Sequence, residues 1–393
     1  SGVSGVPVLS TYADAKTPAG DHDIVVSIGS MSSSKYEFNL VKAKLSITKA
    51  TVIVTAENKM RYYGEKDPEF TANYIGFKNG EILSSSDITG KPSLTTSAVA
   101  TSPVGNYDIQ AATGDLSSTN YKFIFNKGTL VVGKATLVVS ANNLTRPFGA
   151  SNPELTVTFN GLANGETYAT SGMTGWPVLS TTATATSELG NYDISIEPGN
   201  LASGNYAFTF QKGVLSINKA ILTVKAENKS KPYSSPNPEL TFTYNGFVLG
   251  ESLATSGVTG APTISTEAET LSSAGDYDIV VGLGTLAAQH YQINLVKGTL
   301  TITKIPLTIT AESKSKVYGT ANPKFTATYS GFVNGEGLLT SGINGFPSYT
   351  TVANTNTGAG TYDIVIGKGS LISANYAFNF VNGSLTINKA QLT

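Results

Sequence analysis

The sequence contains no cysteine, which excludes disulfide bonds and thiolate metal sites. Charged residues make up only 13% of the chain, far below the roughly 25% of an average globular protein. Ser, Thr, Asn and Gly must therefore supply most of the polar surface. Such a surface is typical of extracellular proteins and rare in cytosolic enzymes, so we expect an extracellular location.

An excess of either charge is also missing. The 26 basic and 27 acidic residues are interspersed, which argues against a nucleic-acid partner because phosphate binding requires a basic face. No apolar run is long enough to cross a membrane and no signal peptide is recognisable, so we expect no membrane contact in this segment. The chain opens in the middle of a repeat, and we expect an export signal and anchor elsewhere in a longer protein.

What the chain does contain is one unit repeated every 85 residues without a single insertion. The period is visible in an aspartate, in a tyrosine and in a lysine that closes each unit. These residues are Asp23, Asp108, Asp193, Asp278 and Asp363; Tyr36, Tyr121, Tyr206, Tyr291 and Tyr376; and Lys49, Lys134, Lys219, Lys304 and Lys389. The predicted domains are a partial repeat at 1–50, complete repeats at 51–135, 136–220, 221–305 and 306–390, and the start of another at 391–393.

Alternating apolar residues predict short strands within each unit, as at Leu307, Ile309 and Ala311. In the last unit, 362–366, 376–380 and 384–388 are expected strands, and the turn before Gly383 suggests a hairpin between the last two. The predicted fold is all-β, a linear array of small two-layer β-sandwich-like domains. The alternative is a β-grasp-like unit with one short helical turn.

The joint between units has its own signature. Before the joint the large apolar residues have even residue numbers, as at Leu300 and Ile302. After the joint they have odd residue numbers, as at Leu307 and Ile309. One continuous strand keeps its phase, so a domain boundary must lie between them. The link is only two or three residues long, which predicts a semi-rigid, extended array whose main partners are the neighbouring repeats.

The unit resembles a known family through a series of short motifs. A strand is followed by Ala-Glu-Asn-Lys-Ser, Tyr-Gly, Asn-Pro-Glu, Gly-Phe, Asn-Gly-Glu, Ser-Gly-x-x-Gly-x-Pro, Tyr-Asp-Ile and a final Asn-Lys-Ala. This pattern resembles the MBG domain of the YGX type, although the Tyr-Gly pair of Tyr318-Gly319 becomes Phe148-Gly149 and Tyr233-Ser234 in other units. The resemblance implies a bacterial cell-surface, adhesin-like protein and supplies no catalytic residues.

The sequence offers no set of residues for catalysis. The two histidines, His22 and His290, do not recur, so a Ser-His-Asp set cannot be built in each unit. The recurring Glu81, Glu166, Glu251 and Glu336 are better explained by turn capping than by glycosidase chemistry, which needs paired carboxylates across a cleft. We expect no enzyme activity and no cofactor. Asp21-His22-Asp23 and Asp276-Tyr277-Asp278 are weak calcium candidates without the Asp-x-Asp-x-Asp-Gly spacing, and no metal site is predicted.

The recurring Asp and closing Lys suggest an ion pair within each unit, or two solvated residues, with a spontaneous amide cross-link between Lys and Asp or Asn as the sharper alternative. Trp176, the only tryptophan, occupies a slot of variable residue type and is the one candidate ligand-binding residue.

The predicted function is a stalk or filament segment of a large extracellular bacterial surface adhesin that extends a distal tip from the cell. The alternative is a repeated glycan- or protein-binding module that acts by avidity. Glycans or a host or substratum surface would then be partners, through other parts of the protein, and lateral self-association stays open. The partial repeat 1–50 lacks its opening strands, so either a preceding segment or a neighbouring chain should cover its apolar face.

Overall fold

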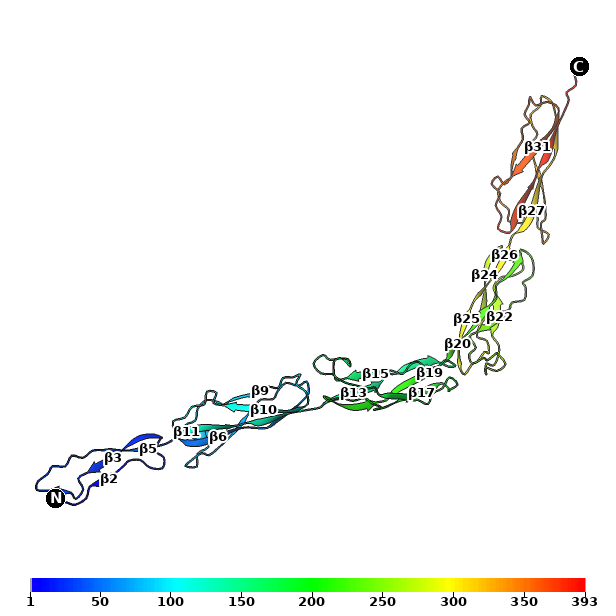
Figure 1. Ribbon diagram of the computed structural model, residues 1–393. Helices are drawn as coiled ribbons and strands as arrows, with labels where there is room; N and C mark the ends of the chain where they lie inside the picture. The colour runs from blue at the N-terminus through cyan, green and yellow to red at the C-terminus, as the bar shows by residue number, and fades with distance from the viewer. Residues whose placement is uncertain (1, 393) are drawn as a thin grey trace. The chain divides into compact units, whose positions relative to one another are not determined.

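The computed structural model describes residues 2–392, and β-strands account for almost all of its regular structure (Figure 1). Seven strands recur in the same order in each complete repeat. The first complete repeat contains β6 (Ala50–Ala56), β7 (Lys59–Tyr62), β8 (Ala72–Ile75), β9 (Ser93–Thr96), β10 (Gly105–Ala112), β11 (Tyr121–Asn126) and β12 (Gly128–Gly133).

The other repeats follow the same plan. Repeat 136–220 contains β13 (Ala135–Ala141), β14 (Leu144–Pro147), β15 (Val157–Asn160), β16 (Val178–Thr181), β17 (Gly190–Glu197), β18 (Tyr206–Gln211) and β19 (Gly213–Asn218). Repeat 221–305 contains β20 (Ala220–Ala226), β21 (Lys229–Pro232), β22 (Phe242–Asn245), β23 (Thr263–Thr266), β24 (Gly275–Gly282), β25 (Tyr291–Val296) and β26 (Gly298–Thr303). Repeat 306–390 contains β27 (Ile305–Ala311), β28 (Lys314–Val317), β29 (Ala327–Ser330), β30 (Ser348–Thr350), β31 (Gly360–Gly367), β32 (Tyr376–Val381) and β33 (Gly383–Asn388).

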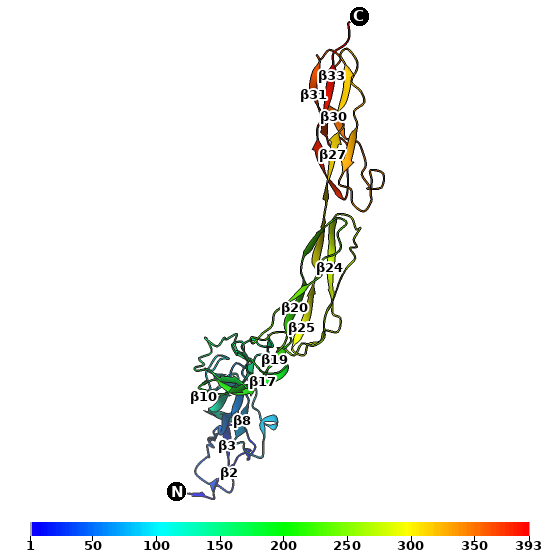
Figure 2. The ribbon, with the colours of Figure 1, turned by 90° about the vertical axis from the view of Figure 1, so that its right-hand side faces the viewer.

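Each complete repeat is built from two small sheets that pack face to face. In repeat 51–135 the sheets have the orders β11-β6-β8 and β7-β12-β10-β9, and β6 lies against β10 and β12. The first strand of each repeat runs parallel to the sixth, as β20 does to β25 (Figure 2). The two-layer sandwich is therefore the correct fold, and the β-grasp alternative is wrong. The one helical element in residues 2–392 is a 3-10 turn, η1 (Leu83–Ser85), with no buried residue.

The predicted hairpin between the last two strands is wrong. β32 pairs with β27 in the three-stranded sheet, whereas β33 pairs with β28 and β31 in the four-stranded sheet. A single residue, Asn382, separates β32 from β33. That link is shorter than the two-residue loop of the tightest common hairpins, so the chain crosses from one layer of the sandwich to the other.

The change of phase at the joints is confirmed by burial. Leu300 and Ile302 of β26 are buried, and so are Leu307 and Ile309 of β27, on the opposite parity of the numbering. One residue, Lys304, lies between the two strands. Each strand can therefore turn its apolar side to the core of its own repeat.

The chain divides into two compact units, which do not coincide with single repeats. The first runs as far as Leu144 and adds Glu154–Thr182 and Asp193–Val214; the second comprises Thr145–Pro153, Ala183–Tyr192 and the chain from Leu215 onward. Every joint contact described below lies inside one of these units.

The partial repeat has fewer strands than the complete ones. It contains β1 (Val3–Ser4), β2 (Val8–Ser10), β3 (Gly20–Ser27), β4 (Ser32–Ser33) and β5 (Ala43–Ile47). β2, β3 and β5 form one sheet, and β1 pairs with β4. Residues 36–42, which correspond to β11 and the residue after it, form no strand.

Candidate functional site

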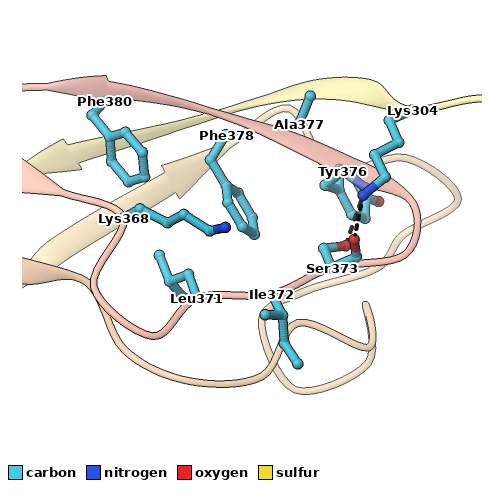
Figure 3. Close-up of a pocket in the computed structure, with 9 residues that line it drawn as sticks. All are labelled: Lys304, Lys368, Leu371, Ile372, Ser373, Tyr376, Ala377, Phe378 and Phe380. Atoms are coloured by element: carbon cyan, nitrogen blue, oxygen red, sulfur yellow. Dashed lines mark hydrogen bonds between the residues drawn. The ribbon is translucent and has the colours of Figure 1, made fainter.

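The closing lysine of each repeat is the centre of the joint. At three of the four joints it is the only residue between two strands, because β12, β19 and β26 each end one residue before it. Its Nζ donates to a backbone carbonyl 69 residues further along, in the next repeat. These hydrogen bonds are Lys49 to Ser118 (2.7 Å), Lys134 to Ser203 (2.8 Å), Lys219 to Ala288 (2.9 Å) and Lys304 to Ser373 (2.7 Å; Figure 3). The closing lysine therefore ties consecutive repeats together.

The expected ion pair between the closing lysine and the recurring aspartate is not formed. Four of the five aspartates instead pair with a lysine 19 residues downstream, and Asp23 also contacts Lys44. The pairs are Asp23–Lys42 (3.1 Å), Asp108–Lys127 (2.8 Å), Asp193–Lys212 (3.0 Å) and Asp278–Lys297 (2.7 Å). The antiparallel register explains the choice, since Asp108 lies opposite Thr129 near the start of β12 and Lys134 follows the far end of that strand. In the last repeat Asn382 occupies the lysine slot beside Asp363.

These ion pairs are exposed and stabilise the fold little. Hydrogen bonds from Lys44 and Lys42 nevertheless lower the pKa of Asp23, and the hydrogen bond to Asp278 raises the pKa of Lys297. The same carboxylates belonged to the weak calcium candidates. Asp21 accepts a hydrogen bond from Ser46 Oγ and Asp276 accepts one from Thr301 Oγ1, so these oxygens are engaged within the sheet.

A tyrosine–glutamate–tyrosine bridge spans two of the joints. Glu166 accepts hydrogen bonds from Tyr206 of its own repeat (2.6 Å) and from Tyr63 of the preceding repeat (2.5 Å). Glu336 does the same with Tyr376 (2.5 Å) and Tyr233 (2.7 Å). The two rings meet edge to face, with centroids 5.5 Å apart for Tyr63 and Tyr206 and 6.1 Å apart for Tyr233 and Tyr376. The capping role expected for these glutamates is therefore wrong here, because they bridge repeats.

Burial and the neighbouring carboxylate both act on the bridging hydroxyls. Loss of solvation and the hydrogen bond to Glu166 raise the pKa of Tyr206 to about 12. The same two causes raise the pKa of Tyr376 to about 12. Burial is also the main cause that raises the pKa of Tyr63 and the pKa of Tyr233. The bridge therefore holds its protons at any physiological pH.

The joint between repeats 136–220 and 221–305 has a different chemistry. Phe148 replaces the bridging tyrosine and stacks on His290, with ring centroids 4.2 Å apart and planes inclined by 12°. His290 Nε2 lies 2.7 Å from a carboxylate oxygen of Glu188. At the other joints an asparagine takes the histidine slot, and its side-chain oxygen accepts an N–H from the preceding repeat. These contacts are Ala19 to Asn120, Val104 to Asn205 and Ala274 to Asn375.

Apolar packing also crosses a joint. One buried cluster contains Leu130 and Val132 of repeat 51–135 together with Leu137, Met173 and Tyr206 of repeat 136–220. Side chains of both repeats are therefore removed from water together. Contacts of this kind oppose bending more strongly than a hydrogen bond alone, because opening the joint would expose apolar surface.

A buried cation recurs in every complete repeat and was not among the predictions from the sequence. The side chain of Arg61 on β7 is 2% exposed; its Nε donates to Asp67 (2.6 Å) and its Nη2 to the carbonyl of Val99 (2.7 Å). Lys231 on β21 donates to the carbonyls of Ser235 (3.0 Å) and Glu269 (2.7 Å), and burial lowers its pKa. Arg146 and Lys316 occupy the same slot. The sequence did carry one signal, a basic residue that recurs at the same period of 85.

Trp176 belongs to an aromatic cluster rather than standing alone. Its ring lies 4.7 Å from that of Tyr168 and 5.6 Å from that of Phe159, and its side chain is half exposed. The turn before it is held tightly: Gly175 has φ +73°, and a Cβ there would lie 2.0 Å from the carbonyl oxygen of Asn200. The side-chain oxygen of Asn200 in turn accepts the backbone N–H of Trp176 at 2.7 Å.

Repeat 306–390 carries two hollows. The first, of about 600 Å³, lies between β29 and β30 and is lined by Phe325, Tyr329, Phe346 and Tyr349. Phe346 holds the slot of Trp176 and is 80% exposed. The second, of about 390 Å³, runs along β32, where Phe378 and Phe380 face Lys368 and Leu371 (Figure 3).

The sequence profile of the MBG domain (YGX type) family matches four segments of the chain, 52–131, 137–216, 222–301 and 307–386. The chain belongs to the MBG domain (YGX type) family. The YGX tyrosine of the MBG repeats is the bridging residue Tyr63 or Tyr233 of the joints, and its replacement by Phe148 removes the bridge from one of them.

Comparisons with whole proteins add little to the MBG assignment. No curated protein matches the chain. Among solved structures, Drosophila N-cadherin EC1-3 is similar with a TM-score of 0.15 and 8% identity, over 51% of this chain and 77% of that one. The I9–I11 tandem of titin is similar with a TM-score of 0.14 and 13% identity, over 86% of this chain and 100% of that one. Scores this low carry no argument, and the fold rests on the sheets themselves.

Both histidines of the MBG repeats have structural contacts. His22 Nε2 lies 2.7 Å from the carbonyl oxygen of Pro18, where the other repeats place a tyrosine hydroxyl, as Tyr107 does with Pro103 (2.8 Å).

Among residues 2–392, no group of three or more His, Asp or Glu side chains is placed to hold a metal ion. No helix in that part of the chain is long and apolar enough to cross a membrane.

Proposed function

We propose that these tandem MBG domains form a stalk or filament segment of a large extracellular bacterial surface adhesin, holding a distal tip away from the cell. The observation that carries the proposal is the joint. At each of the four joints the closing lysine donates to the next repeat, and at three of them it is the only residue between two strands. A linker of one residue leaves little freedom, and each contact across it removes more.

The composition is consistent with this role. The low charge content and the Ser, Thr and Asn surface suit an extracellular spacer, and the absence of cysteine leaves repeated packing as the source of stability. The Tyr63–Glu166–Tyr206 bridge lies at a joint, where it connects two repeats. We therefore propose that the chain is not an enzyme and that its main partners are its own neighbouring repeats.

Small-angle X-ray scattering of residues 1–393 tests the proposal. A compact 85-residue domain has a radius of gyration of about 12 Å and a length of about 35–45 Å, so the array should behave as a rod well over ~100 Å long. Inserting Gly-Ser-Gly-Ser-Gly-Ser after Lys134 should broaden the distance distribution, because the joint contacts are then lost. A compact particle, or a profile that the insertion leaves unchanged, would contradict the stalk.

The second candidate is a glycan- or protein-binding module, which the Phe159–Tyr168–Trp176 cluster and the groove at Phe346 favour. Aromatic faces stack on the apolar faces of sugars and on flat side chains. As Trp176 is the only tryptophan, tryptophan fluorescence excited where tyrosine does not absorb reports on that cluster alone. Under this candidate, titration with soluble oligosaccharides should give a saturable tryptophan fluorescence change that Tyr168→Ala abolishes and Phe346→Leu leaves intact. No change with any oligosaccharide would contradict glycan binding at the cluster.

A further inference from the structure

In repeat 136–220 one tyrosine ring is held against two other aromatic rings. The ring centroid of Tyr168 lies 4.7 Å from that of Trp176 and 5.4 Å from that of Phe159. The Tyr168 hydroxyl donates to the carbonyl of Gly175. Phe159 lies on β15, whereas Tyr168 lies in the loop that follows. The rings of Phe159 and Trp176, together with the Gly175 carbonyl, therefore form a seat for one phenol ring.

Repeat 306–390 keeps both walls of this seat, two steps of 85 residues further along. Tyr329 on β29 holds the position of Phe159, and Phe346 holds that of Trp176. β29 pairs with β27 in the same register as β15 pairs with β13, so the first wall is placed alike in both repeats.

The turn that carries the second wall is also kept. Gly345 has φ +90°, as Gly175 has φ +73°, and in both repeats the residue before this glycine forms a β-bridge to the corresponding later position. The backbone N–H of Phe346 donates to Ser370 Oγ at 3.0 Å, and Ser370 is the counterpart of the acceptor Asn200. The Gly345 carbonyl is therefore placed like that of Gly175, and within residues 2–392 it accepts no hydrogen bond.

What repeat 306–390 lacks is the ring that fills the seat. Leu338 holds the position of Tyr168, and its shorter side chain does not line the hollow of about 600 Å³ that lies against Tyr329 and Phe346. Phe346 is 80% exposed, and among residues 2–392 no ring is stacked on it. The volume of the hollow falls within the roughly 300–1,000 Å³ of small-molecule sites.

We propose that this hollow is a binding site for a small phenol, an aromatic ring that carries one hydroxyl. The ring lies against Tyr329 and Phe346, and its hydroxyl donates to the carbonyl of Gly345. Contacts between aromatic rings and the removal of apolar surface from water supply the attraction. Lys91 and Ala261 replace Phe346 in two other repeats, and in repeat 136–220 the seat is already filled. The site goes beyond the stalk role and does not depend on it.

The experiment uses the whole chain, residues 1–393, and p-cresol, which has the structure of a tyrosine side chain. Saturation-transfer difference NMR should show saturable binding at millimolar concentrations, as expected for so small a ligand. The methyl ether of p-cresol cannot donate to the Gly345 carbonyl and should bind at least threefold more weakly. Methyl β-glucopyranoside should not displace p-cresol. A sugar that displaced it as well as unlabelled phenol does would overturn the ligand class.

Matched variants of the chain decide whether the hollow is the site. Leu338→Tyr restores the ring that Tyr168 supplies in repeat 136–220, so it should fill the seat and weaken p-cresol binding at least fivefold. Leu339→Tyr adds the same ring at the next position, where the side chain is 99% exposed, and should leave binding unchanged. Phe346→Ala should weaken binding at least fivefold, whereas Val352→Ala, at a similarly exposed position outside the hollow, should not. Absence of binding up to the solubility limit of p-cresol, or equal binding to the Leu338→Tyr chain, would overturn the proposal.

Discussion

Replacing Arg61 with alanine is expected to lower the free energy of unfolding of repeat 51–135 by about 2–4 kcal/mol. The change removes a side chain that is 2% exposed, takes the Nε donor from the Asp67 carboxylate and leaves the Val99 carbonyl with the Ser102 N–H alone. Native-state hydrogen exchange on the whole chain measures the effect locally, at β10 and β12. Repeats 221–305 and 306–390 serve as internal references, because additivity holds for distant sites.

The chain itself provides matched controls for this change. Asp67→Asn recreates the Arg146–Asn152 pair of the next repeat, and Arg61→Lys with Asp67→Asn recreates the slot occupied by Lys231 and Asn237. Both controls keep a cation that donates to the carbonyls, so each should cost no more than about 1 kcal/mol. If Arg61→Ala lowers the free energy of unfolding by no more than the double variant does, the buried cation does not hold the strand to the loop as the geometry indicates.

Raising the pH from 9 to 11.5 should weaken the joints that contain a tyrosine–glutamate bridge. The pKa of Tyr206 and of Tyr376 is about 12 in the folded protein and 10.0 ordinarily. A raised folded pKa contributes stability that is fully present below the unfolded value and lost as pH rises through the folded value. One pKa unit corresponds to 1.36 kcal/mol, so each hydroxyl contributes about 3 kcal/mol at most, lost between pH 10 and 12.

Calorimetric melting of the whole chain and its variants checks the sign. Tyr206→Phe should lower the melting temperature of one transition at pH 9 by about 5–10 °C, because Glu166 loses a donor inside the joint. At pH 11.5 the wild-type hydroxyl stabilises the joint less, so the same substitution should lower the melting temperature by clearly less than it does at pH 9. Tyr62→Phe, at an exposed position, should show no such convergence. A penalty at the Tyr206 position that stays constant or grows with pH would contradict the assigned role.

Much of the fold follows from local patterns. Alternation of apolar residues located the strands around Leu307 and Tyr376, because a half-buried strand shows the same period wherever it occurs. The change of phase at Lys304 located a joint, because the residues of one continuous strand alternate strictly between its two faces. Strand pairing was not predictable in the same way. The hairpin expected between β32 and β33 is absent, because these two strands, although neighbours in sequence, belong to different sheets.

The candidate site was less accessible from the sequence. The recurring Asp108 and Lys134 suggested one ion pair, but strand register brings Asp108 to Lys127 and the joint brings Lys134 to Ser203. The bridge between Tyr63 and Glu166 joins residues 103 positions apart. A conserved spacing within one chain shows that residues share a role in each repeat; it does not show which of them meet across a joint.

The sequence by itself determines the period of 85, the all-β class and the inward face of each strand, because these depend on side-chain alternation along the chain. Only the tertiary structure decides which segments become strands. Residues 36–41 and 121–126 share the leading tyrosine and an aromatic two residues later, yet 121–126 form β11 and 36–41 form no strand. The physical reason is hydrogen bonding: β11 pairs with β6 at six consecutive positions, and residues 36–41 have no counterpart of β6 beside them.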